Sequence, residues 1–172
     1  MIYKKEKQRL FWRIFAQSLF LVIVFCCHST PGLSLRVFGV LPLLLIPFVV
    51  CVGMFEHETS GAFFGLAAGI LWDVVSPRLP GFNAILLMVI GCACGLCVSY
   101  LMKNSLISSV YLCFASLLAY QLLDWLCNYC FFGRPGAGYA FWHFYVPQML
   151  YSLVYILPYY FIMRFLVKTV RR

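Results

Sequence analysis

The stretch "GAFFGLAAGILWDVV" at residues 61–75 holds three glycines and one aspartate at intervals of four residues. Gly61, Gly65, Gly69 and Asp73 therefore share one side of a helix. In lipid, helices gain nothing from burying apolar surface against each other, so they pack where small residues let their backbones approach. The glycines thus predict a packing face on an apolar helix, and the aspartate extends that face.

The rest of the chain has the composition of an integral membrane protein. Its 172 residues are 64% hydrophobic and 10% charged, with a mean hydropathy of +0.93, whereas about a quarter of the residues in a soluble domain are charged. A run of about 20 apolar residues is long enough to cross a bilayer as a helix. We predict an all-α integral membrane protein, a single polytopic domain over residues 1–172, with six transmembrane helices at about 11–30, 37–54, 60–77, 82–102, 106–127 and 143–166.

The distribution of basic residues predicts the orientation of these helices. Ten of the 13 Lys and Arg residues fall on the side of the N-terminus, and three fall on the other side: Arg36, Arg78 and Arg134. Cytoplasmic loops carry the excess of positive charge in membrane proteins. An even number of spans also puts both basic ends on one side. We therefore predict that the N- and C-termini lie in the cytoplasm, and we attribute the net charge of +8 to topology and not to a nucleic-acid partner.

The next span continues the pattern of small residues. Gly91 and Gly95 form another pair four residues apart, and the turn "SPRLPG" (76–81) separates this span from the one before it. Two helices joined by such a short turn can lie antiparallel. The glycines of both helices therefore predict one packing seam.

Asp73 carries more than one interpretation. An acid within a membrane span is costly, by about 2.5–3.5 kcal/mol on insertion scales, and is a candidate functional residue for that reason. Near the outer end of its helix, the carboxylate could cap backbone donors of the following turn or pair with Arg78. It could also receive a cation or a substrate.

A second set of polar residues lies toward the outer end of the fifth predicted span. Gln121, Asp124 and Asn128 recur at intervals that place them along one helix side. Asp73 and Asp124 could then share one cavity or one arginine. The aromatic loop at residues 128–142, which contains Arg134, predicts either an interfacial anchor or a docking surface for a partner outside the membrane.

Other residue types give weaker indications. The nine cysteines lie almost entirely in apolar spans and lack the spacing of a zinc site, which indicates small apolar packing residues. In "EHETSG" (56–61), His57 could bind a metal together with the two glutamates, but a helix cap at Thr59 or Ser60 is the simpler interpretation. Nucleophile-elbow, zinc-protease, P-loop and dinucleotide motifs are absent from the sequence. We expect no enzyme, no metal and no cofactor.

Two segments carry a family resemblance. The run "VLPLLLIPFVV" (40–50), followed by "GAFFGLAAGILWDVVSPRLPGFNAILLMVIGCACG" (61–95), resembles the rod shape-determining protein MreD family. The shared features are a proline-bearing helix, a glycine-rich helix that ends in G-x-x-x-D, a short turn and a second glycine-bearing helix. The matching positions are Gly61, Gly65, Gly69, Asp73 and Gly81.

The resemblance implies assembly and not catalysis. Members of this family belong to the cell-elongation machinery in the bacterial inner membrane. They bind the periplasmic coiled-coil protein MreC and, through it, connect with MreB and with the transpeptidase and glycosyltransferase of wall synthesis. Their fold looks like that of the substrate-binding S components of energy-coupling-factor transporters.

That likeness supplies a rival interpretation, a vitamin-binding transporter subunit. S components typically have two alanines four residues apart on their first helix, where they dock onto the coupling subunit. Here Ala16 is followed four residues later by Phe20. A pocket formed by Asp73, Gln121, Asp124 and Asn128 would favour the transporter.

Overall fold

The computed structural model describes residues 2–30, 41–76, 80–127 and 137–171, and each regular element among them is a helix. The first five helices are separate, and the last four segments follow one another directly along one course. In chain order they are α1 (Ile2–Ser29), α2 (Leu45–Phe55), α3 (Glu58–Val75), α4 (Phe82–Tyr100), α5 (Leu106–Trp125), α6 (Ala137–Ala140), the π-helical turn η2 (Phe141–Tyr145), α7 (Val146–Val154) and α8 (Ile156–Arg171).

Four stretches of helix are long and apolar enough to cross a membrane: Phe11–Ser29, Phe82–Tyr100, Leu106–Trp125 and Phe141–Lys168. The protein is therefore a helical membrane protein. The sequence predicts six such spans, and the difference lies in α2 and α3. With 18 residues, α3 has the length, but its glycines and its Ser, Thr, Glu and Asp residues lower its apolar character.

The helix predicted at 37–54 is much shorter in the structure. Residues 41–44 are not helical, α2 begins at Leu45, and residues 37–40 lie outside the described part of the chain. The two prolines of this segment do not bend the helix. Pro42 precedes the helix, and Pro47 lies in its first turn, where a backbone N–H has no intrahelical partner to lose.

The helix α2 forms the centre of the molecule. Its 11 residues span about 16 Å at 1.5 Å per residue, roughly half of a ~30 Å hydrocarbon core. Every residue from Leu45 to Met54 is buried. The helices α1, α3, α4, α5 and α8 all pack against it.

The final course, where the sequence predicts one transmembrane helix at 143–166, consists of several helical segments. The π-helical turn η2 precedes α7, and a break at Tyr155 separates α7 from α8. Pro147 lies in the first turn of α7, and Pro158 lies three residues after the break. Because proline cannot donate to the carbonyl four residues earlier, the helical hydrogen bonding is weakened at these points.

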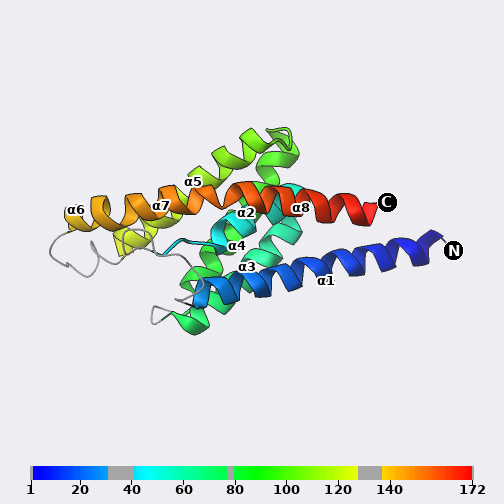
Figure 1. The fold of residues 1–172 in the computed structure, drawn as a ribbon, viewed down its shortest axis with the longest axis horizontal. Coiled ribbons are helices and arrows are strands. Elements are labelled where there is room, and N and C mark those ends of the chain that lie inside the picture. The colour runs from blue at the N-terminus through cyan, green and yellow to red at the C-terminus, as the bar shows by residue number, and fades with distance from the viewer. Residues whose placement is uncertain (1, 31–40, 77–79, 128–136, 172) are drawn as a thin grey trace.

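Both chain termini lie at one end of the molecule, which we call the terminal end (Figure 1). The helices α1 and α8 run side by side toward it. The opposite end, which we call the far end, carries α6 and the end of α1 (Figure 1). The same-end placement of the termini is the arrangement that an even number of crossings produces.

Cysteines contribute to the core as small apolar side chains. Cys51, Cys94 and Cys113 are buried, and the eight described cysteines are all free. The Cys94 Sγ atom lies 3.4 Å from Ser116 Oγ. Cys130 lies outside the described residues.

Candidate functional site

The predicted glycine seam coincides with the contact between α3 and α4, the most extensive helix contact in the molecule. A Cβ atom added at Gly61 would lie 2.5 Å from the Gly91 carbonyl oxygen, and one added at Gly95 would lie 2.5 Å from Glu58 Cα. Real Cβ atoms do not approach backbone so closely. The two helix backbones therefore touch directly, as small residues permit in membrane proteins.

The same close approach continues along the whole seam. A Cβ at Gly65 would lie 2.8 Å from the Leu87 carbonyl carbon, and one at Gly69 would lie 2.6 Å from the Ala84 nitrogen. Glycines later in α3 meet residues earlier in α4: Gly61 meets Gly91, Gly65 meets Leu87 and Gly69 meets Ala84. The two helices are therefore antiparallel. Gly53 of α2, which was not predicted to belong to the seam, meets it as well: its Cβ would lie 2.6 Å from the Gly91 oxygen.

Asp73 closes the seam at the far end as a helix cap. Its carboxylate accepts hydrogen bonds from the backbone N–H groups of Gly81 (3.0 Å), Asn83 (3.2 Å) and Ala84 (3.1 Å). Gly81 is the N-cap residue of α4 and has a positive φ of 89°, which favours glycine. Of the interpretations of Asp73, the structure places the carboxylate in the capping arrangement. Arg78, its other suggested partner, lies outside the described residues.

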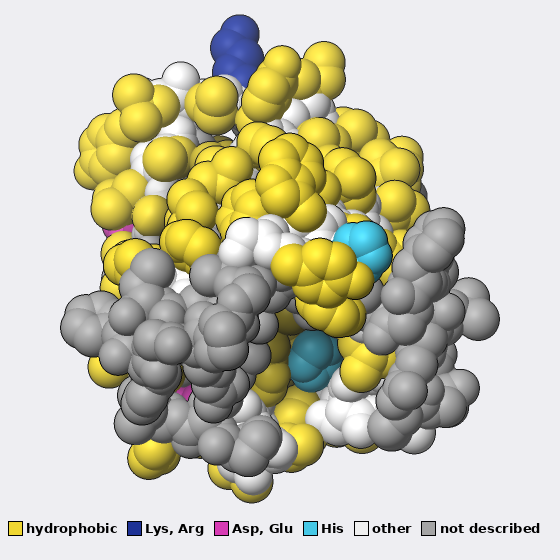
Figure 2. Space-filling view, turned by 90° about the vertical axis from the view of Figure 1, so that its left-hand side faces the viewer, with side chains coloured by type: hydrophobic (Ala, Val, Ile, Leu, Met, Phe, Trp, Pro, Cys, Tyr) yellow, Lys and Arg dark blue, Asp and Glu magenta, His cyan; other side chains and the backbone are white. Residues whose placement is uncertain are grey.

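A cavity of about 410 Å³ opens at the far end. Its walls are formed by the ends of α1 and α3, by residues 41–43, and by parts of α5, η2 and α7. Figure 2 looks onto this end and shows a hollow with apolar and histidine side chains inside it. Gln121 and Asp124 line the cavity, as the polar pattern of the fifth span predicts, but Asp73 does not line it. The two acids do not share this cavity, because the carboxylate of Asp73 is turned to the start of α4.

The polar residues of the cavity wall are tied to their neighbours. Tyr145 donates a hydrogen bond to Asp124 Oδ2 at 2.9 Å. The amide nitrogen of Gln121 lies 3.5 Å from Gln148 Oε1, and Gln148 Nε2 donates to the Leu41 carbonyl at 2.9 Å. These contacts connect α5, η2 and α7 with the segment before α2.

The non-helical backbone before α2 is satisfied by side chains of α7. The Leu43 N–H donates to Ser152 Oγ at 2.8 Å, and Gln148 binds the Leu41 carbonyl as described above. Irregular backbone at membrane depth persists only where protein or a water-filled cavity surrounds it. The non-helical residues that make α2 short thus also form part of the cavity wall.

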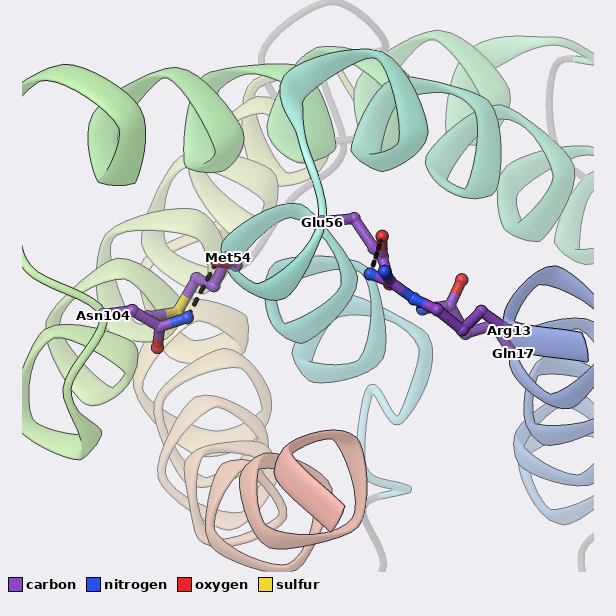
Figure 3. Close-up of polar contacts among 5 residues, drawn as sticks. All are labelled: Arg13, Gln17, Met54, Glu56 and Asn104. Carbon is purple, nitrogen blue, oxygen red and sulfur yellow. Dashed lines mark hydrogen bonds and ion pairs between the residues drawn. The ribbon is translucent and has the colours of Figure 1, made fainter. Parts of the chain in front are cut away.

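A second polar cluster holds the other end of α2, toward the terminal end (Figure 3). Glu56 accepts a hydrogen bond from Arg13 at 2.5 Å, which is also an ion pair, and another from Gln17 at 2.6 Å. On the opposite side of α2, Asn104 Nδ2 donates to the Met54 carbonyl at 3.0 Å. This cluster joins α1 and the α4–α5 turn to the end of α2.

This second cluster was not predicted, although the sequence carries a signal for it. Arg13 and Gln17 are four residues apart and near the start of an apolar span, so they lie on one helix side. The predicted cap at Thr59 or Ser60 is wrong, because α3 begins at Glu58 with His57 as its N-cap. No group of three His, Cys, Asp or Glu side chains suited to a metal ion occurs within the described ranges.

Two candidate residues, Asn128 and Arg134, lie outside the described residues. Comparison of the chain with protein-family models, with curated proteins and with solved structures finds no match.

Proposed function

We propose that this protein is an MreD-like membrane scaffold of the bacterial cell-elongation machinery. In this proposal it is not an enzyme. It crosses the inner membrane six times with both termini in the cytoplasm, and it binds an MreC-type periplasmic coiled-coil protein. Through that partner it connects with MreB and with the transpeptidase and glycosyltransferase of lateral wall synthesis.

The observation that carries the proposal is the structure of the segment with the family resemblance. Within this segment, α3 and α4 pack as an antiparallel pair in which the glycines provide backbone contact and Asp73 caps α4. The residues that match the family pattern thus hold α3 and α4 rigidly against each other in this chain. A rigid hairpin of this kind is what a scaffold needs to present a constant surface to a partner.

The position of both termini at one end adds support. A scaffold that links periplasmic and cytoplasmic proteins needs a defined orientation, and ten basic residues on the predicted inner side supply one. The short helix α2 and the 18-residue α3 would cross the bilayer as parts of this assembly, covered by the longer helices.

The test is recovery of partners from native membranes. The tagged full chain, extracted in gentle detergent, is expected to bring down a single-span coiled-coil protein together with wall synthases, identified by mass spectrometry. An unrelated tagged polytopic protein from the same membranes is the control. Recovery of a pair of ATPases with a coupling membrane subunit would overturn the proposal.

A matched pair of variants sharpens the test. If the loop at 128–142 docks the periplasmic partner, Arg134→Glu should reduce its recovery severalfold. Lys103→Glu makes the same charge change on the predicted cytoplasmic side and should leave recovery unchanged. Equal recovery from both variants would remove the loop from the partner surface without affecting the scaffold proposal.

One observation favours a second candidate, the substrate-binding S component of an energy-coupling-factor transporter. The far-end cavity contains the convergent polar residues Gln121 and Asp124 that such a site would need. Against it, Asp73 is turned away from the cavity, and Phe20 stands where a docking alanine is typical. The ATPase outcome of the partner recovery separates this candidate from the scaffold.

A further inference from the structure

We propose that the exposed side of α8 binds an anionic phospholipid of the leaflet at the terminal end, with the phosphate between Arg164 and Lys168 and an acyl chain along Phe161 and Leu157. This inference goes beyond the scaffold function and does not depend on it. It rests on the pattern, depth and charge of that helix side.

Four exposed residues of α8 form one continuous line, which we call the α8 stripe. Leu157, Phe161, Arg164 and Lys168 follow one another at intervals of four, three and four residues, which place them on one side of the helix. Leu157 is 42% exposed, Phe161 is 56% exposed, and both cations are exposed. The stripe changes from apolar to basic toward the terminal end, as a lipid of that leaflet changes from acyl chain to headgroup.

The depth of the α8 stripe corresponds to one leaflet. The apolar course Phe141–Lys168 contains 28 residues, about 42 Å of helix, and a bilayer with its headgroup regions is about 40–45 Å thick. Lys168 therefore lies at the edge of the headgroup region, and Arg164 lies about 6 Å closer to the hydrocarbon core. Both cations are at the level of lipid headgroups, whereas Leu157 and Phe161 lie beside acyl chains.

The two cations of the stripe have no partner in the described part of the chain. Neither side chain makes an ion pair or a hydrogen bond there, in contrast to Arg13, which pairs with Glu56. Like charges four residues apart repel each other on a helix, and an anion between them removes this repulsion. A phosphate also supplies acceptors to Arg164, because guanidinium groups bind phosphate through two parallel hydrogen bonds.

The surroundings of the stripe attract anionic lipids toward it. The helix α1 runs beside α8 toward the terminal end (Figure 1). The part of α1 before Phe11 carries four basic residues and one acidic residue. Basic segments next to a membrane span concentrate anionic lipids within about a Debye length. The α8 stripe therefore faces a leaflet that is enriched in its proposed ligand.

The test measures the dissociation constants of single lipids from the purified full chain by native mass spectrometry. Phosphatidylglycerol and phosphatidylcholine with identical acyl chains are titrated separately, because they differ in net charge. We expect phosphatidylglycerol to bind about 25-fold more tightly, about fivefold for each of the two cations. The double variant Arg164→Gln/Lys168→Gln should lose this preference and bind both lipids equally.

The matched control is Lys103→Gln, which removes an exposed charge between α4 and α5, outside the stripe. It should keep the full preference for phosphatidylglycerol. Excess glycerol phosphate, the headgroup chemistry without acyl chains, should not displace the lipid from the unmodified chain.

Three results would overturn the proposal. They are equal binding of the two lipids to the unmodified chain, displacement by glycerol phosphate, and an equal preference for phosphatidylglycerol in the double variant and in Lys103→Gln. The lipid comparison and the glycerol phosphate competition use the unmodified chain, so they decide the question even if the double variant fails to accumulate.

Discussion

Gly65 and Asp73 lie along the same side of α3 but act on α4 in different ways. Gly65 contributes by having no side chain, so that the carbonyl group of Leu87 can lie against its backbone. The Asp73 carboxylate accepts three hydrogen bonds from backbone N–H groups at the start of α4. Each residue therefore supports a distinct prediction.

Replacement of Gly65 by leucine should prevent stable accumulation of the protein. Even the Cβ atom would lie 2.8 Å from the Leu87 carbonyl carbon and 3.1 Å from Met88 Cα, so the helices would have to separate along the seam. Overpacking of this kind costs at least about 1–3 kcal/mol. We expect at least a tenfold loss of monodisperse protein in detergent chromatography, about what 1.4 kcal/mol implies.

The control for this substitution is Ala93→Leu, which places the same leucine side chain on the exposed side of α4. It should accumulate normally. Normal accumulation and activity of Gly65→Leu would contradict the packing role of the seam.

Substitutions at Asp73 should be graded in effect. An asparagine at this position would keep one acceptor oxygen for the α4 N-terminus, whereas a leucine would keep none, and the loss of a helix cap costs about 0.5–2 kcal/mol. We expect Asp73→Asn to lower the thermal midpoint in detergent slightly and Asp73→Leu to lower it severalfold more. Ser99→Ala, at an exposed position of α4, should leave it unchanged. Equal midpoints for Asp73→Leu and the unmodified chain would refute the cap.

At the scale of elements, α2 depends on its neighbours more than any other helix. With 11 residues, it is too short to cross a bilayer by its own helical length, and it has no capping side chain of its own at its N-terminus. Side chains of α7 satisfy the backbone before it, and Glu56, Arg13 and Asn104 hold its other end. Its place in the centre of the molecule is therefore a property of the packed bundle.

The ion pair between Arg13 and Glu56 should hold α1 against the end of α2. Arg13→Met would leave the Glu56 carboxylate, whose side chain is 9% exposed, without its charged partner. The cost should be about 1–3 kcal/mol, as for a buried polar group that loses its partner. Hydrogen exchange of α1 should rise in this variant, and the thermal midpoint in nanodiscs should fall.

A double-substitution cycle separates the pair from its surroundings. Arg13→Met combined with Glu56→Met should be less destabilising than the sum of the two single changes, because no unpaired charge remains. Lys103→Met, at an exposed position between α4 and α5, removes a charge without a partner loss and serves as the control. Strict additivity of the two substitutions would show that the pair does not contribute.

At the scale of the whole molecule, orientation in the membrane follows from charge and from the position of the termini. Both termini lie at one end, and basic residues gather on the predicted inner side. A fluorescent-protein fusion at the C-terminus should be bright, and an alkaline-phosphatase fusion there should be inactive. A phosphatase fusion after residue 134 should be active, and the reverse pattern would contradict the orientation.

The sequence by itself determined the class of the protein and the face on which α3 packs. Apolar run length and composition depend only on local sequence, and glycines four residues apart share one helix side wherever the helix is placed. For the same reason, Gln121 and Asp124 could be assigned to one side of α5 before the cavity was known.

Only the tertiary structure decided what those faces meet. Spacing along one helix places Asp73 beside the glycines, but only the packing of α4 against α3 brings the start of α4 to its carboxylate, away from the cavity. The sequence likewise does not reveal that α2 is only about half as long as a membrane span, because residues 41–44 are as apolar as a helix in lipid. They stay non-helical because Gln148 and Ser152, more than 100 positions later in the chain, satisfy their backbone groups.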